Sequence, residues 1–129
     1  MTIRSGYFFG WFFLWDLGQL LGVNYLEGVM MDIRKPRIEF VYCTQCRWML
    51  RSVWMAQELL STFETEVGEV VLVPATGGIF RVVIDGVTVW NRKTDGGFPQ
   101  ITELKRIVRD VIAPDKPLGH IDRMGEENE

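Results

Sequence analysis

Apolar residues recur along this chain with two different spacings, and the spacings predict six secondary-structure elements. Short runs of alternating or continuous apolar residues predict strands, and longer stretches with an apolar residue every three or four positions predict helices. The expected strands are residues 37–42, 69–74, 79–85 and 87–92, and the expected helices are residues 47–63 and 99–113. The predicted order is therefore strand, helix, strand, strand, strand, helix.

The expected strands differ in how their apolar residues are placed. In the first strand, Ile38, Phe40 and Tyr42 occupy alternate positions, so we expect these three side chains to share the core face. In the second strand, residues 70–73 are continuously apolar. A continuous run predicts a strand that is buried on both faces of the sheet.

The first expected helix carries two neighbouring apolar stripes. The stripe expected to face the sheet consists of Met49, Val53, Ala56, Leu60 and Phe63. Trp48, Met55 and Leu59 form a second stripe beside it. We interpret the second stripe either as core contact with a neighbouring element or as an apolar rim for a partner protein, since exposed apolar patches often mark such sites.

Together these elements predict an α/β fold of the thioredoxin-like class, in the order β-α-β-β-β-α. Strands 37–42 and 69–74 are joined by a helix and should therefore be parallel, with a right-handed crossover. Asp85-Gly86 predicts a hairpin between the last two strands. We expect a four-stranded mixed sheet with both helices on one face, in a domain spanning residues 32–123. An acidic, solvated tail would follow at residues 124–129.

Residues 1–31 do not match the rest of the chain. The run Tyr7–Trp15 contains seven aromatic residues and is too short for a membrane span, which needs about 20 apolar residues. A membrane role is expected only if residues 7–26 are translated and act as a peripheral anchor. Codons for Glu27-Gly28 can resemble a bacterial ribosome-binding site placed upstream of Met30-Met31. We therefore interpret this aromatic extension as an over-extended start, or as a segment without chemistry of its own.

Composition narrows the classes of function. The chain has 129 residues, of which 47% are apolar, and this suits one globular domain. Its formal charge of −3 and the absence of a basic run argue against a nucleic-acid partner. The glycine-rich loop at residues 94–99 lacks the spacing of phosphate-binding loops, so no nucleotide cofactor is expected. Two cysteines are too few for a disulfide-stapled secreted protein, which favours the reducing cytoplasm.

The two cysteines, Cys43 and Cys46, form a Cys-x-x-Cys motif between the first strand and the first helix, which is typical of a redox dithiol. The Thr44-Gln45 spacer is polar, which argues against two inert buried thiols. At the start of a helix, unpaired N–H groups and the helix dipole stabilise a thiolate, and Arg47 adds a cation. We expect Cys43, nearer the helix end and more exposed, to attack a partner disulfide, and Cys46, one turn in, to resolve it.

Three hypotheses remain open for this motif. The first is a thiol–disulfide oxidoreductase, and the second is a binding module whose partner affinity changes with the redox state of the pair. The third is a zinc site shared by two chains, because structural zinc sites have four ligands and the only other soft ligand here is His120. A single histidine without an evident partner also gives little support to a catalytic triad.

Several motifs resemble one known family. They are Phe40-Val41-Tyr42-Cys43-x-x-Cys46, the strands that flank Asp85-Gly86, Asp95-Gly96-Gly97-Phe98-Pro99 and Leu118-Gly119-His120-Ile121-Asp122. Over about residues 37–123 the chain is similar to the selenoprotein W-type (SelT/SelW/SelH) redox family, and more narrowly to its cysteine-containing bacterial members. The glycine-rich Phe-Pro loop and the last motif make this resemblance far more specific than Cys-x-x-Cys alone.

The resemblance implies a thioredoxin-like fold and a thiol-redox role with glutathione or partner proteins as thiol partners. Selenium-containing members place selenocysteine at the position of Cys46, which implies the opposite order of attack. Thioredoxins carry a cis-proline at the position of Phe80, so partner docking is expected to differ from thioredoxin. The residues expected to support the dithiol are Thr44, Gln45, Arg47, Trp48, Phe80, Gly97 and Phe98.

Overall fold

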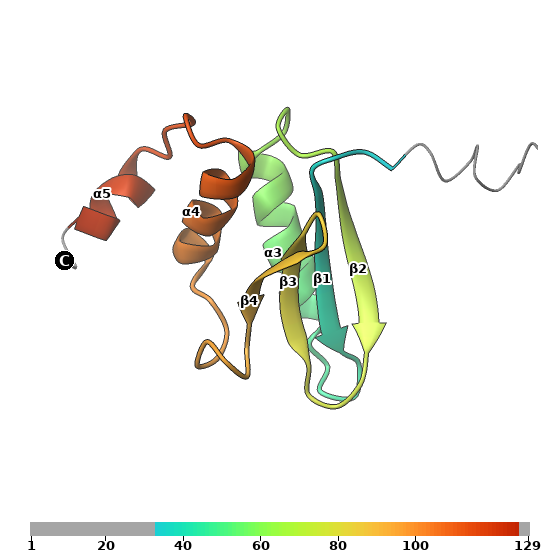
Figure 1. The fold of residues 1–129 in the computed structure, drawn as a ribbon. Coiled ribbons are helices and arrows are strands. Elements are labelled where there is room, and N and C mark those ends of the chain that lie inside the picture. The colour runs from blue at the N-terminus through green and yellow to red at the C-terminus, as the bar shows by residue number, and fades with distance from the viewer. Residues whose placement is uncertain (1–32, 127–129) are drawn as a thin grey trace, which may run out of the picture. The chain divides into compact units, whose positions relative to one another are not determined.

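The computed structural model describes residues 33–126, and this part of the chain forms one four-stranded mixed sheet and three helices (Figure 1). The elements are β1 (Arg37–Cys43), α3 (Met49–Thr62), β2 (Glu69–Ala75), β3 (Phe80–Ile84), β4 (Val87–Asn91), α4 (Ile101–Ile112) and α5 (His120–Glu126). The predicted α/β class and the predicted order of the first six elements are confirmed.

The strands lie in the order β2-β1-β3-β4. As predicted, β1 pairs with β2 in parallel through the α3 connection, and it pairs with β3 in antiparallel fashion on its other side. β3 and β4 form the predicted hairpin. Asp85 and Gly86 in its turn have φ angles of 47° and 84°, which suits a tight turn that follows the strand twist. The central position of β1 brings its C-terminal end between two neighbouring strands.

Helices α3 and α4 pack against one face of the sheet (Figure 1). β1 contributes Ile38, Phe40 and Tyr42 to the core between them, as predicted from their alternation. The other core residues are Met55, Ala56, Leu59, Phe63, Phe80, Val82, Ile84, Leu104 and Val108. The core therefore sits on the helix side of the sheet.

The rotation of α3 differs from the prediction. Ala56 and Phe63 are buried as expected, but Met55 and Leu59 from the second stripe are buried as well. The residues predicted to face the sheet that instead lie exposed are Met49, Val53 and Leu60. Because α4 packs beside α3, the helix buries the stripe that faces both the sheet and α4. The core interpretation of Met55 and Leu59 is thus confirmed.

The predicted burial of β2 on both faces is wrong. β2 lies at the edge of the sheet, its residues are only partly buried, and Leu72 is exposed. An apolar run is compatible with an edge strand here because β2 gains its contacts from β1 and α3.

The C-terminal region contains a further helix, α5, which is not among the six predicted elements and which extends into the predicted acidic tail at residues 124–129. Asp122 in α5 accepts a hydrogen bond from the Leu118 backbone N–H at 2.7 Å, and its other oxygen pairs with Arg109 of α4 at 2.8 Å. These two contacts fix α5 to α4. A short helix with few apolar residues gives only a weak periodic signal, which explains why the pattern did not reveal it.

The N-terminal predictions fall outside the described residues. The aromatic extension at residues 1–31, the anchor at residues 7–26 and the domain boundaries therefore stay predictions. Among residues 33–126, no helix is long and apolar enough to cross a membrane.

Candidate active site

Strand β1 delivers Cys43 to one end of the sheet. Because β1 lies between β2 and β3, the Cys43 side chain is buried and only 1% exposed. Cys43 pairs with Ala75 at the end of β2, and the next residue, Thr44, donates from both N and Oγ1 to the Ala75 carbonyl at 3.0 and 3.2 Å. The first residue after the strand is thereby held to β2.

A turn, not a helix, carries the rest of the motif. Arg47 has a φ of 58°, which a right-handed helix does not allow, and α3 begins only at Met49. The Arg47 N–H bonds the Thr44 carbonyl at 3.1 Å, which closes the turn. The prediction that both cysteines lie in the first helical turn is therefore wrong, because Arg47 separates Cys46 from the helix.

The two sulfurs lie in contact across this turn. Cys46 Sγ donates to Cys43 Sγ at 2.8 Å, and both thiols are free. Cys46 is the exposed thiol and Cys43 the buried one. The predicted order of exposure is therefore reversed: Cys43 belongs to the central strand, while Cys46 protrudes on the turn.

The two thiols differ in pKa. The pKa of Cys43 is lowered, above all by the hydrogen bond from Cys46, and further by the backbone N–H groups of Gly78, Cys46 and Gln45. The same hydrogen bond between the two thiols raises the pKa of Cys46, and the positive charge of Arg92 partly opposes that rise. Of the two thiols, Cys43 is therefore the one that loses its proton more readily.

Gly78 is a site residue that the sequence analysis missed. It lies in the turn between β2 and β3 and has a φ of 70°, which glycine adopts without strain. Its backbone N–H lowers the pKa of both Cys43 and Cys46. The thioredoxin comparison indicated this segment, but it pointed to Phe80, whose side chain is fully buried.

Three predicted supporting residues form one aromatic cluster. The Phe98 ring lies 5.0 Å from Trp48 and 4.9 Å from Phe80, centroid to centroid, with edge-to-face geometry in both contacts. Gly97 holds this loop in place, since its carbonyl accepts from Trp90 Nε1 at 2.9 Å and its N–H bonds the Arg92 carbonyl at 3.0 Å. Phe98, in the loop after β4, thus contacts Trp48, the residue directly before α3.

Two arginines that the sequence analysis did not single out lie on this cluster. The Arg51 guanidinium lies 4.0 Å from the centre of the Phe98 ring, and that of Arg92 lies 4.8 Å from the Trp48 ring. Such contacts attract a cation to an aromatic face. They give Arg92 a fixed place within electrostatic reach of Cys46.

Metal binding by the described residues of one chain has no support. Among residues 33–126, no group of three or more cysteine, histidine, aspartate or glutamate residues is placed to hold a metal ion. A zinc site shared by two chains needs a second copy and stays a prediction.

Comparison with known proteins identifies the family. The model of the Rdx family matches residues 37–110, which span both cysteines and every element from β1 to α4 in whole or large part. The chain belongs to the Rdx family. The comparison with curated proteins gave no match.

Two solved structures are similar to this Rdx chain. A structural-genomics target from Bordetella parapertussis is 59% identical, with a TM-score of 0.57, and the match covers 58% of this chain and 95% of that one. A selenoprotein W-related protein from Vibrio cholerae is 54% identical, with a TM-score of 0.58, covering 59% and 95%. The predicted resemblance to the selenoprotein W-type family is confirmed.

Proposed function

We propose that this Rdx chain is a thiol–disulfide redox protein that cycles between a Cys43/Cys46 dithiol and an internal disulfide. The observation that carries the proposal is the 2.8 Å contact between the two free sulfurs, with Cys46 donating to Cys43. A disulfide bond is about 2.05 Å long, so bond formation needs little movement. Membership of a family that includes a selenoprotein W-related protein supports the same chemistry.

In this proposal Cys46 attacks, because a partner disulfide can reach an exposed sulfur but not a buried one. The Cys43 thiolate first takes the proton of Cys46 across their hydrogen bond. The Cys46 thiolate then forms a bond to one partner sulfur, and the partner disulfide breaks. The departing partner thiolate takes up the proton that Cys43 had received, which returns Cys43 to its thiolate form. This order reverses the one expected from the helix-start argument and agrees with the one that the resemblance implies.

Cys43 completes the cycle as the resolving thiol. Its lowered pKa favours the thiolate, which attacks Cys46 and releases the second partner thiol. The partner disulfide has then been reduced to two thiols, and the protein holds a Cys43–Cys46 disulfide. A low-molecular-weight thiol such as glutathione would return the pair to the dithiol, and the reducing cytoplasm suits such a cycle.

Trapping of mixed disulfides tests the proposal. Cys43→Ser keeps the attacking thiol and removes the resolving thiol, so it should retain partner proteins covalently until a reductant releases them. Cys46→Ser should retain far fewer, and the double variant measures background. Trapping by Cys46→Ser alone would reverse the two roles. Trapping by neither variant would reject the exchange and favour the redox-gated binding module or the two-chain zinc site. A measurement of bound zinc would distinguish these two alternatives.

A further inference from the structure

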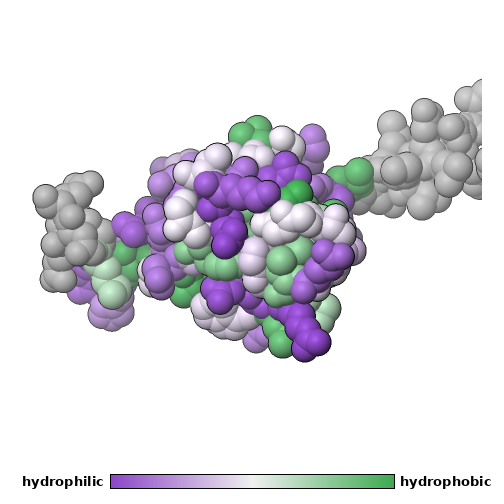
Figure 2. All heavy atoms as spheres, turned by 90° about the horizontal axis from the view of Figure 1, so that it is seen from below, coloured by the Kyte–Doolittle hydropathy of each residue, from purple (hydrophilic) through white to green (hydrophobic). Residues whose placement is uncertain are grey.

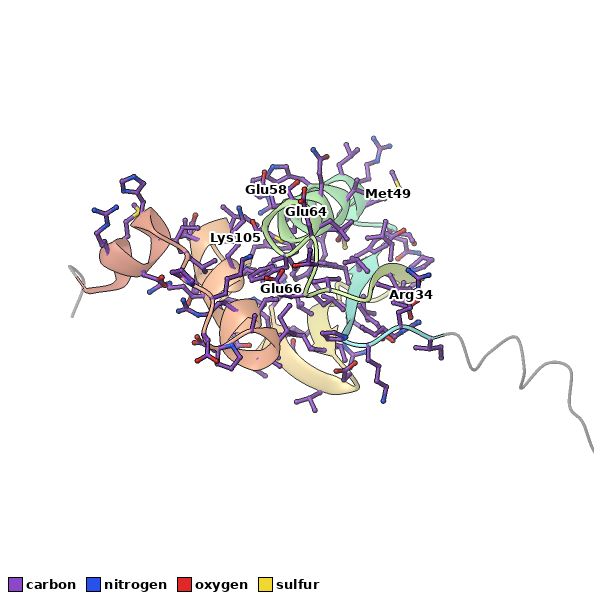
Figure 3. All side chains as sticks on the ribbon, turned by 90° about the horizontal axis from the view of Figure 1, so that it is seen from above. Arg34, Met49, Glu58, Glu64, Glu66 and Lys105 are labelled. Carbon is purple, nitrogen blue, oxygen red and sulfur yellow. The ribbon has the colours of Figure 1, made fainter. Side chains whose placement is uncertain are left out.

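The first two turns of α3 present an unusual number of apolar side chains to solvent. Met49, Leu50, Val53 and Trp54 are 48%, 74%, 38% and 47% exposed, respectively. Positions separated by three and four residues lie on the same side of a helix, so these four form one continuous surface. The Met49 side chain points away from the body of the domain (Figure 3). This surface begins three residues after the exposed thiol of Cys46.

The same surface has an excess of positive charge. Arg47 and Arg51 flank the apolar side chains, and the first turn of α3 contains no acidic residue. Cations at a helix N-terminus oppose the helix dipole, so this placement stabilises the isolated helix less than acidic residues would. The nearest acidic residue along α3, Glu58, pairs with Lys105 of α4 at 2.7 Å (Figure 3).

Neighbouring elements add cations at this end of the domain. Arg92 and Lys93 follow β4, and the carboxylate of Asp95 in the same loop accepts a hydrogen bond from the Asn91 N–H. Seen from the end at which β1 and β2 finish, hydrophilic and hydrophobic patches are interspersed over the surface (Figure 2). The positive charge contrasts with the net charge of −3 of the whole chain.

The apolar surface is also longer than a small thiol compound could cover. Val53 and Leu60 continue along α3 into an open groove of about 430 Å³, whose opposite wall contains Val70 and Leu72 of β2. From Met49 to Trp54 the helix rises about 7.5 Å, so this stretch alone can contact about two residues of an extended peptide, and the groove adds to that length.

We propose that Arg47, Met49, Leu50, Arg51, Val53 and Trp54 form a docking surface for a partner protein whose disulfide is flanked by apolar residues and carboxylates. The inference rests on the proposed function and adds the class of partner. Apolar contact with α3 would supply affinity, and the arginines would attract the carboxylates and orient the disulfide toward Cys46. Peptides that carry lysine in place of the carboxylates would be repelled.

The test uses the reduced full chain and three synthetic peptides, each with one cysteine held as a 2-pyridyl mixed disulfide. Two glutamates and a leucine flank the cysteine in the first peptide, two lysines and a leucine in the second, and two glutamates and a serine in the third. Release of pyridine-2-thione gives the exchange rate. The neutral 2-hydroxyethyl 2-pyridyl disulfide measures the reactivity of the dithiol itself, and peptide rates are divided by this rate.

The glutamate–leucine peptide should react about tenfold faster than the lysine peptide at low salt, with a smaller ratio in 1 M salt. It should also react faster than the serine peptide. The double variant Arg47→Gln/Arg51→Gln should remove most of the preference for glutamate over lysine. The double variant Leu50→Ser/Trp54→Ser should remove most of the preference for leucine over serine. Arg34→Gln and Val111→Ser, which change an exposed cation and an exposed valine elsewhere, should preserve both.

Equal normalised rates for the three peptides would overturn the inference and leave the exchange function standing. A dimer that Leu50→Ser/Trp54→Ser converts to monomers in sedimentation would also overturn it, because the surface would then bind a second copy. A chain that fails to react even with the small disulfide overturns the proposed exchange and this inference with it.

Discussion

The pKa of Cys43 is lowered above all by the hydrogen bond from Cys46 and further by backbone N–H groups, and not by the start of a helix. The backbone N–H groups of Gln45 and Cys46 lie in the Cys-x-x-Cys turn and that of Gly78 lies in the β2–β3 connection, and all three lower the pKa of Cys43. Successive backbone N–H groups in a turn bind anions in the way that a helix N-terminus does. The Cys-x-x-Cys spacing therefore correctly indicated that the two thiols lie together, but the groups that lower the pKa of Cys43 depend on a turn that propensity does not reveal.

Removal of the Arg92 charge should make Cys46 less acidic. The charge of Arg92 lowers the pKa of Cys46, so Arg92→Gln should raise that pKa. At pH values below the pKa, less Cys46 is then thiolate, and alkylation by iodoacetamide should be slower. The comparison is made in the Cys43→Ser background, where alkylation reports Cys46 alone, with Arg34→Gln as the matched loss of a distant cation. An unchanged pH profile of alkylation would show that Arg92 acts on the Trp48 ring only.

At the scale of elements, α3 shows what periodicity can and cannot predict. Its apolar spacing correctly indicated a helix packed on the sheet, and it correctly placed Ala56 and Phe63 in the core. It did not select between two adjacent stripes, because the choice depends on where α4 packs. The same limit applies to β2, where the apolar run predicted a strand but not its place at the sheet edge.

Adjacent leucines on α3 provide a direct test of the helix rotation. Leu59 is fully buried and Leu60 is 46% exposed, although the apolar spacing predicted that Leu60 would face the sheet. Leu59→Ala should lower the free energy of unfolding by about 2–5 kcal/mol, and Leu60→Ala by less than about 1 kcal/mol. Urea denaturation of the two variants measures the difference, and equal losses would contradict the observed rotation.

At the scale of the whole molecule, ion pairs join the C-terminal segment to the helical layer. Asp122 bonds the Leu118 N–H and Arg109, and Lys116 pairs with Glu66 at 2.9 Å. The sequence indicated the Leu118–Asp122 motif as part of the family resemblance, but not its structural role. Pairing of residues this far apart along the chain follows from the tertiary fold, which local patterns do not encode.

These carboxylates should make stability depend on pH in the acid range. The Leu118 N–H and Arg109 lower the pKa of Asp122 below its usual 3.8, and Lys116 lowers that of Glu66 below its usual 4.5. A lowered folded-state pKa adds stability above the unfolded-state value, and this stability is lost as pH falls through the folded value. As the pH is lowered from about 4.5, the Tm should therefore decrease, and it should decrease less steeply in the double variant Asp122→Asn/Glu66→Gln. Equal slopes of Tm against pH in the two proteins would contradict this assignment.

The contact between Gly78 and the sulfurs also links redox state to backbone motion. The Gly78 N–H belongs to a different segment from the Cys-x-x-Cys turn, and it favours the thiolate form of Cys43 because it lowers the pKa of that thiol. A disulfide sulfur is neutral and accepts hydrogen bonds only weakly. Oxidation would therefore release the amide at the tip of the β2–β3 connection, and its proton would exchange faster with solvent. Oxidation of Cys43 and Cys46 would thus increase local opening in the β2–β3 connection, a loop that contains no cysteine.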